Sequence, residues 1–145
     1  MKKIEEYTVR GQLTELSVEK IQLFDGRFDT GYRIVEFQIA PRVPSGQLDG
    51  YATLATEEGT LSGGTWEWDD NTQVAWSSFS EGGGAFSPNN VISIVDPDNL
   101  IIEDLYIYAN SSSSSQVINY MIKLEKYDIT DWQGALAMVR NRAQA

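Results

Sequence analysis

The sequence predicts an all-β fold: an antiparallel β-sandwich of about eight strands, resembling a jelly roll, with one short C-terminal α-helix. Three observations predict this fold. Apolar and polar side chains alternate in many short segments, as in strands with one buried face. Gly, Pro, Asp and Asn separate these segments, and only the last segment changes to the apolar spacing of a helix. We expect residues 1–145 to form a single domain.

Four strands are expected in the first part of the chain, at residues 7–15, 19–24, 32–40 and 51–56. The strand at 32–40 has the clearest alternation, and it places Val35, Phe37 and Ile39 on one face. Two prolines that follow this strand end it, because proline cannot continue a hydrogen-bonded ladder. Residues 1–6 are mostly charged and can form an N-terminal arm.

A hairpin is expected at residues 66–79, where Trp66 and Trp68 alternate with acidic residues ahead of an Asp-Asn turn. The segments on either side of it, 57–65 and 80–87, are rich in Gly and Ser and are expected to be loops. A short strand follows at 91–95.

The longest alternation covers residues 99–124, and we expect two long strands there, paired as a hairpin and joined by a serine-rich turn. Leu105, Ile107 and Ala109 share one face of the first strand. Ile118, Tyr120, Ile122 and Leu124 share one face of the second. The predicted core therefore comprises Val35, Phe37, Ile39, Leu105, Ile107, Ile118, Ile122 and Leu124.

The chain ends in a predicted helix at residues 130–142. Thr130 with Gln133 three residues later has the pattern of a capping box. The apolar residues after Thr130 follow helical spacing, and basic residues occupy the last turn. A helix of this length is marginal alone, so we expect it to dock on the sandwich or on a neighbouring subunit. The residues expected at such an interface are Trp132, Leu136, Val139, Arg140 and Arg142.

The composition narrows the classes of function. The chain lacks cysteine and histidine, which excludes disulfides, thiolate or imidazole metal ligands and the usual histidine general base. We therefore expect no enzymatic activity and no cofactor. A net charge of −10 disfavours nucleic acid and anionic membranes as partners, and no apolar run is long enough for a transmembrane helix. The N-terminal residues do not resemble a signal peptide, so assembly in a cytoplasm is expected.

Two tryptophans beside acidic residues form the most suggestive feature. Trp66 and Trp68, together with Trp76, could stack on a sugar ring while nearby acids bind its hydroxyls. The alternative interpretation is a hairpin whose aromatic side chains pack across the strands. Tyr106 and Tyr108 on the long alternating segment suit a protein interface, or equally the outer wall of the domain's own core.

The acidic residues allow two further interpretations, neither of which we favour. Calcium could bind the oxygens of Asp96, Asp98 and Asn99, but these residues lack the twelve-residue loop of a typical calcium site and are more simply a turn. Paired carboxylates could serve glycoside hydrolysis, but no spacing fixes their separation. The candidate pairs are Glu57 with Glu58, Glu67 with Asp69, and Glu103 with Asp104.

The final third of the chain resembles small structural proteins of marine tailed bacteriophages. The resemblance is carried by EDLYIY at 103–108, VINYMIKLEKY at 117–127 and AMVRNRAQ at 137–144, and more loosely by residues 37–56. It implies a jelly-roll capsid decoration or cement protein in the virion, often trimeric, with the major capsid protein and further copies of itself as partners. The alternatives are a carbohydrate-binding module that uses the tryptophans, and a tail or neck component of the particle.

Overall fold

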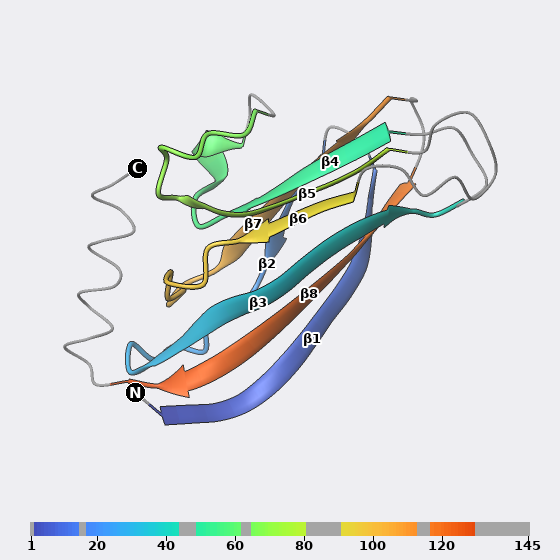
Figure 1. Cartoon of the computed structure of the whole chain (residues 1–145). Helices are drawn as coiled ribbons and strands as arrows, with labels where there is room; N and C mark the ends of the chain where they lie inside the picture. Colours follow the sequence, from blue (N-terminus) through green and yellow to red (C-terminus); the bar gives the residue numbers. More distant parts are fainter. Residues whose placement is uncertain are drawn as a thin grey trace.

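A computed structural model describes residues 2–14, 17–43, 49–61, 65–80, 91–112 and 117–129 of the chain. Eight strands form two antiparallel sheets, which confirms the predicted all-β sandwich (Figure 1). Within these ranges the one helical element is the 3-10 turn η1, Glu58–Thr60. The predicted helix at 130–142, with Trp132, Leu136, Val139, Arg140 and Arg142, lies outside the described residues. The strands are β1 Lys2–Thr14, β2 Ser17–Ile21, β3 Thr30–Pro41, β4 Asp49–Ala55, β5 Gln73–Ser80, β6 Val91–Val95, β7 Leu105–Ser111 and β8 Val117–Asp128.

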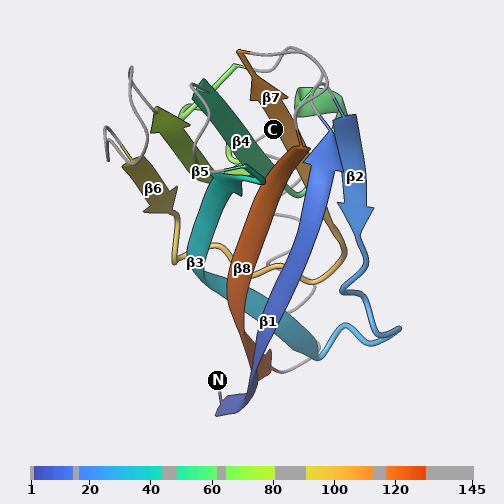
Figure 2. The ribbon, with the colours of Figure 1, turned by 90° about the vertical axis from the view of Figure 1, so that its right-hand side faces the viewer.

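The smaller sheet has the order β1-β8-β3 and the larger one has the order β2-β7-β4-β5-β6 (Figure 2). The pairs β1–β8, β2–β7 and β4–β5 are those that form when a long hairpin is wound around a core. In a complete winding of that kind β6 would pair with β3, but here it pairs with β5 and stands at the edge of the larger sheet. The Ser93 hydroxyl of β6 donates a hydrogen bond to the Phe37 carbonyl of β3, so the two edge strands lie beside each other.

The N-terminal residues belong to a strand. Residues 2–6, expected as a possible arm, extend β1 and pair with the end of β8, from Lys2 opposite Asp128 onward. The register shifts between Lys3 and Glu5, which leaves Ile4 as a bulged and exposed residue.

The two long strands at 105–111 and 117–128 are confirmed, but their predicted pairing as a hairpin is wrong. β7 lies between β2 and β4 in the larger sheet, whereas β8 is the central strand of the smaller one. The two strands lie in opposite sheets (Figure 1), and their apolar side chains belong to one core cluster. Alternation in the sequence reports which face is buried, and it is the same whether two strands pair or face each other.

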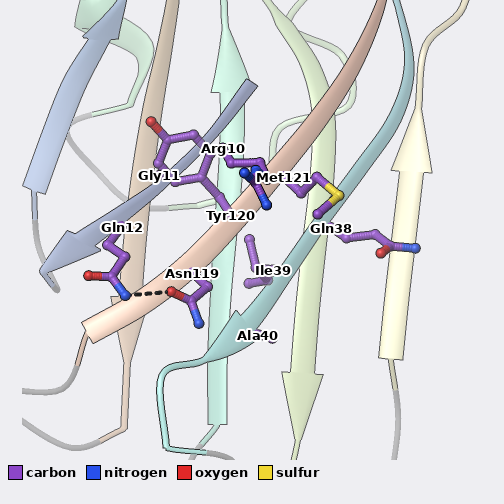
Figure 3. A pocket seen from close by; sticks show the side chains of 9 residues that line it. All are labelled: Arg10, Gly11, Gln12, Gln38, Ile39, Ala40, Asn119, Tyr120 and Met121. Atoms are coloured by element: carbon purple, nitrogen blue, oxygen red, sulfur yellow. Dashed lines mark hydrogen bonds between the residues drawn. The ribbon is translucent and has the colours of Figure 1, made fainter. Parts of the chain in front are cut away.

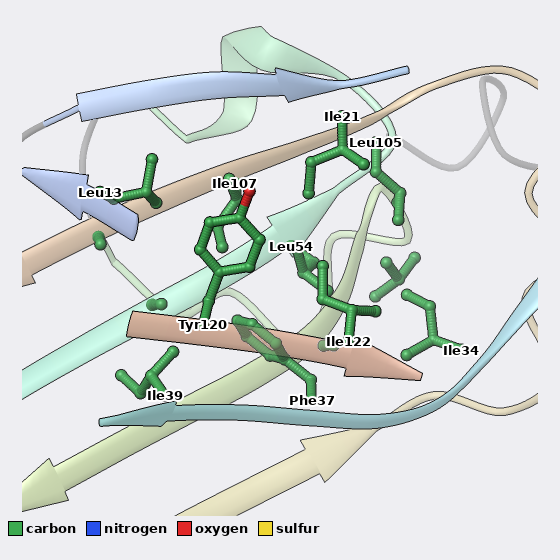
Figure 4. Close-up of a cluster of buried hydrophobic side chains, with 14 of the residues drawn as sticks. Leu13, Ile21, Ile34, Phe37, Ile39, Leu54, Leu105, Ile107, Tyr120 and Ile122 are labelled. Carbon is green, nitrogen blue, oxygen red and sulfur yellow. The ribbon is translucent and has the colours of Figure 1, made fainter. Parts of the chain in front are cut away.

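The core lies between the sheets and is formed by the inward side chains of both (Figure 4). Seven of the eight predicted core residues are buried there, but Val35 is 48% exposed, so that prediction is wrong. The ladder between β3 and β8 shifts register between Ile34 and Glu36, which makes Val35 the extra residue of a β-bulge. Ile34 then takes the inward position that strict alternation would give to Val35.

Two glycines make room for aromatic rings on the neighbouring strand. Gly11 of β1 lies opposite Tyr120 of β8, and a Cβ added at Gly11 would lie 2.5 Å from the tyrosine hydroxyl oxygen. In the other sheet Gly50 lies opposite Phe79, whose ring would lie 2.6 Å from an added Cβ. The missing side chains therefore let both rings lie flat against the strand beside them.

Candidate functional site

The outer face of the larger sheet carries a row of side chains that crosses all five strands. In register from β2 to β6 the row consists of Val18, Tyr108, Thr53, Trp76 and Ile94. Each belongs to the face turned away from the core, because its strand neighbours in sequence point inward. This row is the base on which the candidate site is built.

The segment between β4 and β5 covers the centre of the row. Leu61 follows η1 and is buried against Ala55 and Tyr108, with Tyr51 and Tyr106 at the margin. The loop predicted as exposed at 57–65 therefore contains an apolar residue that closes over the sheet. Tyr108 is only 6% exposed and Tyr106 is half-buried, so Tyr108 belongs to the outer wall of the domain's own core.

Gln73, at the start of β5, fixes the segment that carries the tryptophans. Its side-chain oxygen accepts hydrogen bonds from the Glu67 backbone N–H (2.8 Å) and from the Trp76 indole N–H (3.0 Å). Its side-chain nitrogen donates to the Thr65 carbonyl at 3.2 Å. Gln73 is 2% exposed, so these bonds replace water that the amide would otherwise need.

The predicted hairpin at 66–79 does not form, because residues 65–69 are not a strand. Instead, Gln73 binds their backbone groups from the side. Asp70 closes the following turn by accepting bonds from the Thr72 backbone N–H and hydroxyl at 2.9 and 2.6 Å. The expected Asp-Asn turn is therefore present, but it connects a loop, and not a strand, to β5.

The three candidate tryptophans have different environments. Trp76 is 7% exposed and cannot present a ring face to a ligand, which differs from the expectation of three stacking tryptophans. Trp66 is half-buried, with its ring edge-on to Tyr51 at 6.5 Å between centroids. Trp68 is 63% exposed and lies edge-on to Trp76 at 5.9 Å. Trp68 alone of the three is therefore available for stacking.

Exposed apolar side chains continue from Trp76 onto β6. Ile94 lies opposite Trp76 and Ile92 lies opposite Ser78, and both are more than a third exposed. Val91, at the start of the same strand, is 66% exposed. Val91 lies opposite the core residue Phe79 and points to the other face of the strand. We call Trp68, Ile92 and Ile94, which share the outer face, the β6 patch. It lies at the edge of the larger sheet, on the side where β6 adjoins β3.

The sequence located β6 but gave no indication that it would be exposed. Its residues, VISIV, form a nearly continuous apolar run, which is typical of a strand buried on both faces. In the structure four of its five residues are exposed. The available signal was its length of five residues, because edge strands are often short.

Two of the acidic residues considered for metal binding or catalysis, Asp96 and Asp104, have structural roles. Asp96 accepts bonds from the Asp98 backbone N–H at 3.1 Å and from the Asn99 side chain at 3.3 Å, which is a turn. Burial would raise the pKa of Asp104, but bonds from the backbone N–H groups of Phe24 and Leu23 and from Lys20 outweigh it, so the pKa is lowered. Across the described ranges no group of three or more acids is placed to hold a metal ion.

No helix in the described part of the chain is long and apolar enough to cross a membrane.

Comparison with known proteins adds little to this geometry. No family model matches the sequence, and no curated protein matches it. Among solved structures, a chain from the X-ray structure of tomato aspermy virus aligns at 12% identity with a TM-score of 0.46. The alignment covers 82% of this chain and 76% of that chain. At this identity and TM-score the similarity supports no inference about family or function.

Proposed function

We propose that this chain is a structural protein of a bacteriophage particle, and specifically a decoration or cement protein that binds the outer surface of the capsid. The observation that carries the proposal is the β6 patch, an edge strand with exposed apolar side chains beside an exposed tryptophan. The wound sandwich, which we interpret as a jelly roll with β6 displaced from β3, and the resemblance of residues 103–108 and 117–127 to phage structural proteins support the same role.

An exposed apolar edge strand needs a partner. The backbone edge of β6 lies beside β3, so the exposed part of this strand is its apolar outer face. Exposed β-branched side chains promote association, and proteins usually protect such strands with charges, proline or a covering segment. Ile92 and Ile94 provide apolar surface, and covering each would contribute about 1 kcal/mol to association. Ion pairs on the other sheet show that this chain does place charges on its exposed strands, which makes their absence from β6 distinctive.

The contribution to the particle would be mechanical. A patch of this size gives modest affinity per copy, because association costs several kcal/mol of lost freedom. Repetition over a symmetric shell, and trimerisation of the decoration protein itself, would raise the total through multivalency. We propose that the chain acts by binding, with the major capsid protein and its own copies as partners, in the virion.

Mass spectrometry of purified particles tests the role, and absence of the chain from them would overturn it. Rebinding to particles that lack the chain tests the surface. Ile94→Lys places a charge in the β6 patch and should reduce rebinding at least about tenfold. Ile4→Lys is the matched control, because Ile4 is an exposed isoleucine on β1 (47% exposed, against 38% for Ile94), at the far edge of the other sheet. Equal rebinding of both variants would exclude the β6 patch as the contact.

A second candidate function is carbohydrate binding through Trp68. The ring is 63% exposed and its loop is fixed by Gln73, so it is a preorganised stacking surface. Glu67 and Asp69 beside it are exposed and could accept hydrogen bonds from sugar hydroxyls. A glycan array with the wild-type chain and Trp68→Ala separates this function from the first. Placement as a tail or neck component would be shown by where the chain lies in the particle.

A further inference from the structure

The outer face of the smaller sheet divides into two halves of different chemistry. In the half near the N-terminus the charges are paired: Glu125 receives Lys3 and Arg33, each at 2.9 Å, and Lys123 lies 3.4 Å from Glu36. In the other half, six outward strand residues lie side by side, and one arginine among them carries the only charge. These residues are Arg10 and Gln12 on β1, Asn119 and Met121 on β8, and Gln38 and Ala40 on β3.

This second half contains a depression of about 540 Å³ (Figure 3). Its floor is the backbone of the central row, Gly11, Tyr120 and Ile39, whose register position turns their side chains toward the core. The six outward residues stand on the two rows that flank the floor. A space of this volume is within the range of small-ligand sites, roughly 300–1,000 Å³.

Arg10 is the unusual member of this set. It is exposed, and within the described ranges it forms no ion pair or hydrogen bond. By contrast, Arg33 of β3 and Lys123 of β8, which lie on the same sheet face, each have a carboxylate partner. In a chain with a net charge of −10, an arginine without a carboxylate partner, beside a depression, provides a local site for an anionic group.

The amides add a second requirement for the ligand. The Gln12 side-chain nitrogen donates to the Asn119 side-chain oxygen at 2.8 Å, which leaves the Gln12 oxygen and the Asn119 nitrogen free (Figure 3). Gln38 offers both a donor and an acceptor on the opposite side. Side chains that both donate and accept hydrogen bonds suit a ligand with hydroxyl groups, because a hydroxyl also does both. Met121 and Ala40 add apolar surface that can contact the C–H groups of the ligand.

We infer that this depression binds an acidic sugar, a uronic acid residue of an oligosaccharide. Arg10 holds the carboxylate through its two-pronged guanidinium, and Gln12, Asn119 and Gln38 bind the hydroxyls. An extended acidic peptide fits less well, because peptides usually add to a free strand edge. The depression is centred on β8, whose backbone is already paired on both sides. This site is separate from the β6 patch and does not depend on the proposed virion role.

The test is calorimetric titration of the free, full-length chain with tetragalacturonate, with neutral maltotetraose and with tetraglutamate. We expect tetragalacturonate to bind best, and more weakly as salt is raised. Arg10→Gln should weaken the binding of tetragalacturonate by about tenfold or more. Arg10→Lys should weaken it by less, because lysine keeps the positive charge but lacks the paired N–H groups of the guanidinium. The matched control is Lys2→Gln, which removes the same charge from the same strand about 26 Å away.

Four results would overturn the inference. The first is no saturable binding of tetragalacturonate at millimolar concentration. The second is an equal affinity of Arg10→Gln and Lys2→Gln for tetragalacturonate. The third is tighter binding of tetraglutamate than of tetragalacturonate. The fourth is loss of binding in Trp68→Ala but not in Arg10→Gln, which would assign the sugar to the β6 patch. Arg10 is exposed, so the variant should fold, and a circular dichroism spectrum checks that it does.

Discussion

Replacing Gln73 by alanine should release the tryptophan-bearing loop and destabilise the whole domain. The side chain makes three hydrogen bonds, to Glu67, Trp76 and Thr65, in a position that is 2% exposed. At about 1 kcal/mol for each bond, with little water to replace them, the free energy of unfolding should fall by about 3 kcal/mol. For a domain of this size the corresponding drop in Tm is roughly 10 °C.

Two measurements check this prediction. Urea unfolding gives the change in free energy, and the circular dichroism couplet of the Trp68–Trp76 pair, with centroids 5.9 Å apart, reports whether the loop stays in place. Gln22→Ala is the control, because Gln22 is exposed and should change stability by no more than about 0.5 kcal/mol. A Gln73→Ala protein as stable as the Gln22→Ala protein, with an unchanged couplet, would refute the role given to Gln73.

Three further predictions concern the core, the charged face and the β6 patch. Gly11→Ala should lower the free energy of unfolding in urea by about 1–3 kcal/mol, because its methyl group would meet the Tyr120 ring. Gly59→Ala is the control and should be nearly neutral, since nothing lies within 4 Å of the added carbon. Equal losses in the two variants would contradict the close packing of Gly11 against Tyr120. Hydrogen bonds from Tyr127, Lys3 and Arg33 lower the pKa of Glu125 to about 2. The contribution of this group to the free energy of unfolding is therefore complete above its ordinary pKa and is lost as the pH falls toward 2. Glu125→Gln should flatten the pH dependence of the free energy of unfolding in this range, and an unchanged pH dependence would count against the prediction. Ile94→Lys should lower the aggregation rate of the free chain, measured by light scattering, relative to Ile4→Lys, and no difference would argue that β6 is not the adhesive edge.

Much of the fold could be predicted because alternation reports burial directly. The strand at 91–95 was placed at its observed bounds, and the apolar faces of β7 and β8 were assigned correctly. The pairing of β7 with β8 could not be predicted in the same way. Leu105 and Ile122 face the same core whether their strands are neighbours or lie in opposite sheets.

The errors have local causes that leave no mark in a sequence pattern. A single bulge residue exposes Val35 and moves Ile34 inward, and nothing in the residue types around it requires a bulge. The alternation of Trp66 and Trp68 suggested a strand, but the side chain of Gln73 binds the backbone that a partner strand would have paired.

The candidate sites were harder to predict than the fold because they depend on what covers each face. The residue type of Tyr108 suits an interface or the outer wall of the core, and Leu61, which closes over it, decides for the wall. The β6 patch has the opposite character, since VISIV resembles a buried strand and lies exposed. Arg10 was an unremarkable charge in the sequence, and its significance comes from the contrast with Lys3, Arg33 and Lys123, which are paired on the same sheet.

Hydrogen exchange of the chain, compared between its free state and purified particles, most directly tests whether it acts through the β6 edge. Backbone amides of residues 91–95 should exchange measurably more slowly in the particle, while those around the bulge at Ile4 on β1 should change little. If the chain is present in particles and residues 91–95 exchange as they do in the free protein, β6 is not the contact. If the chain is absent from the particles, it is not a structural protein of the virion.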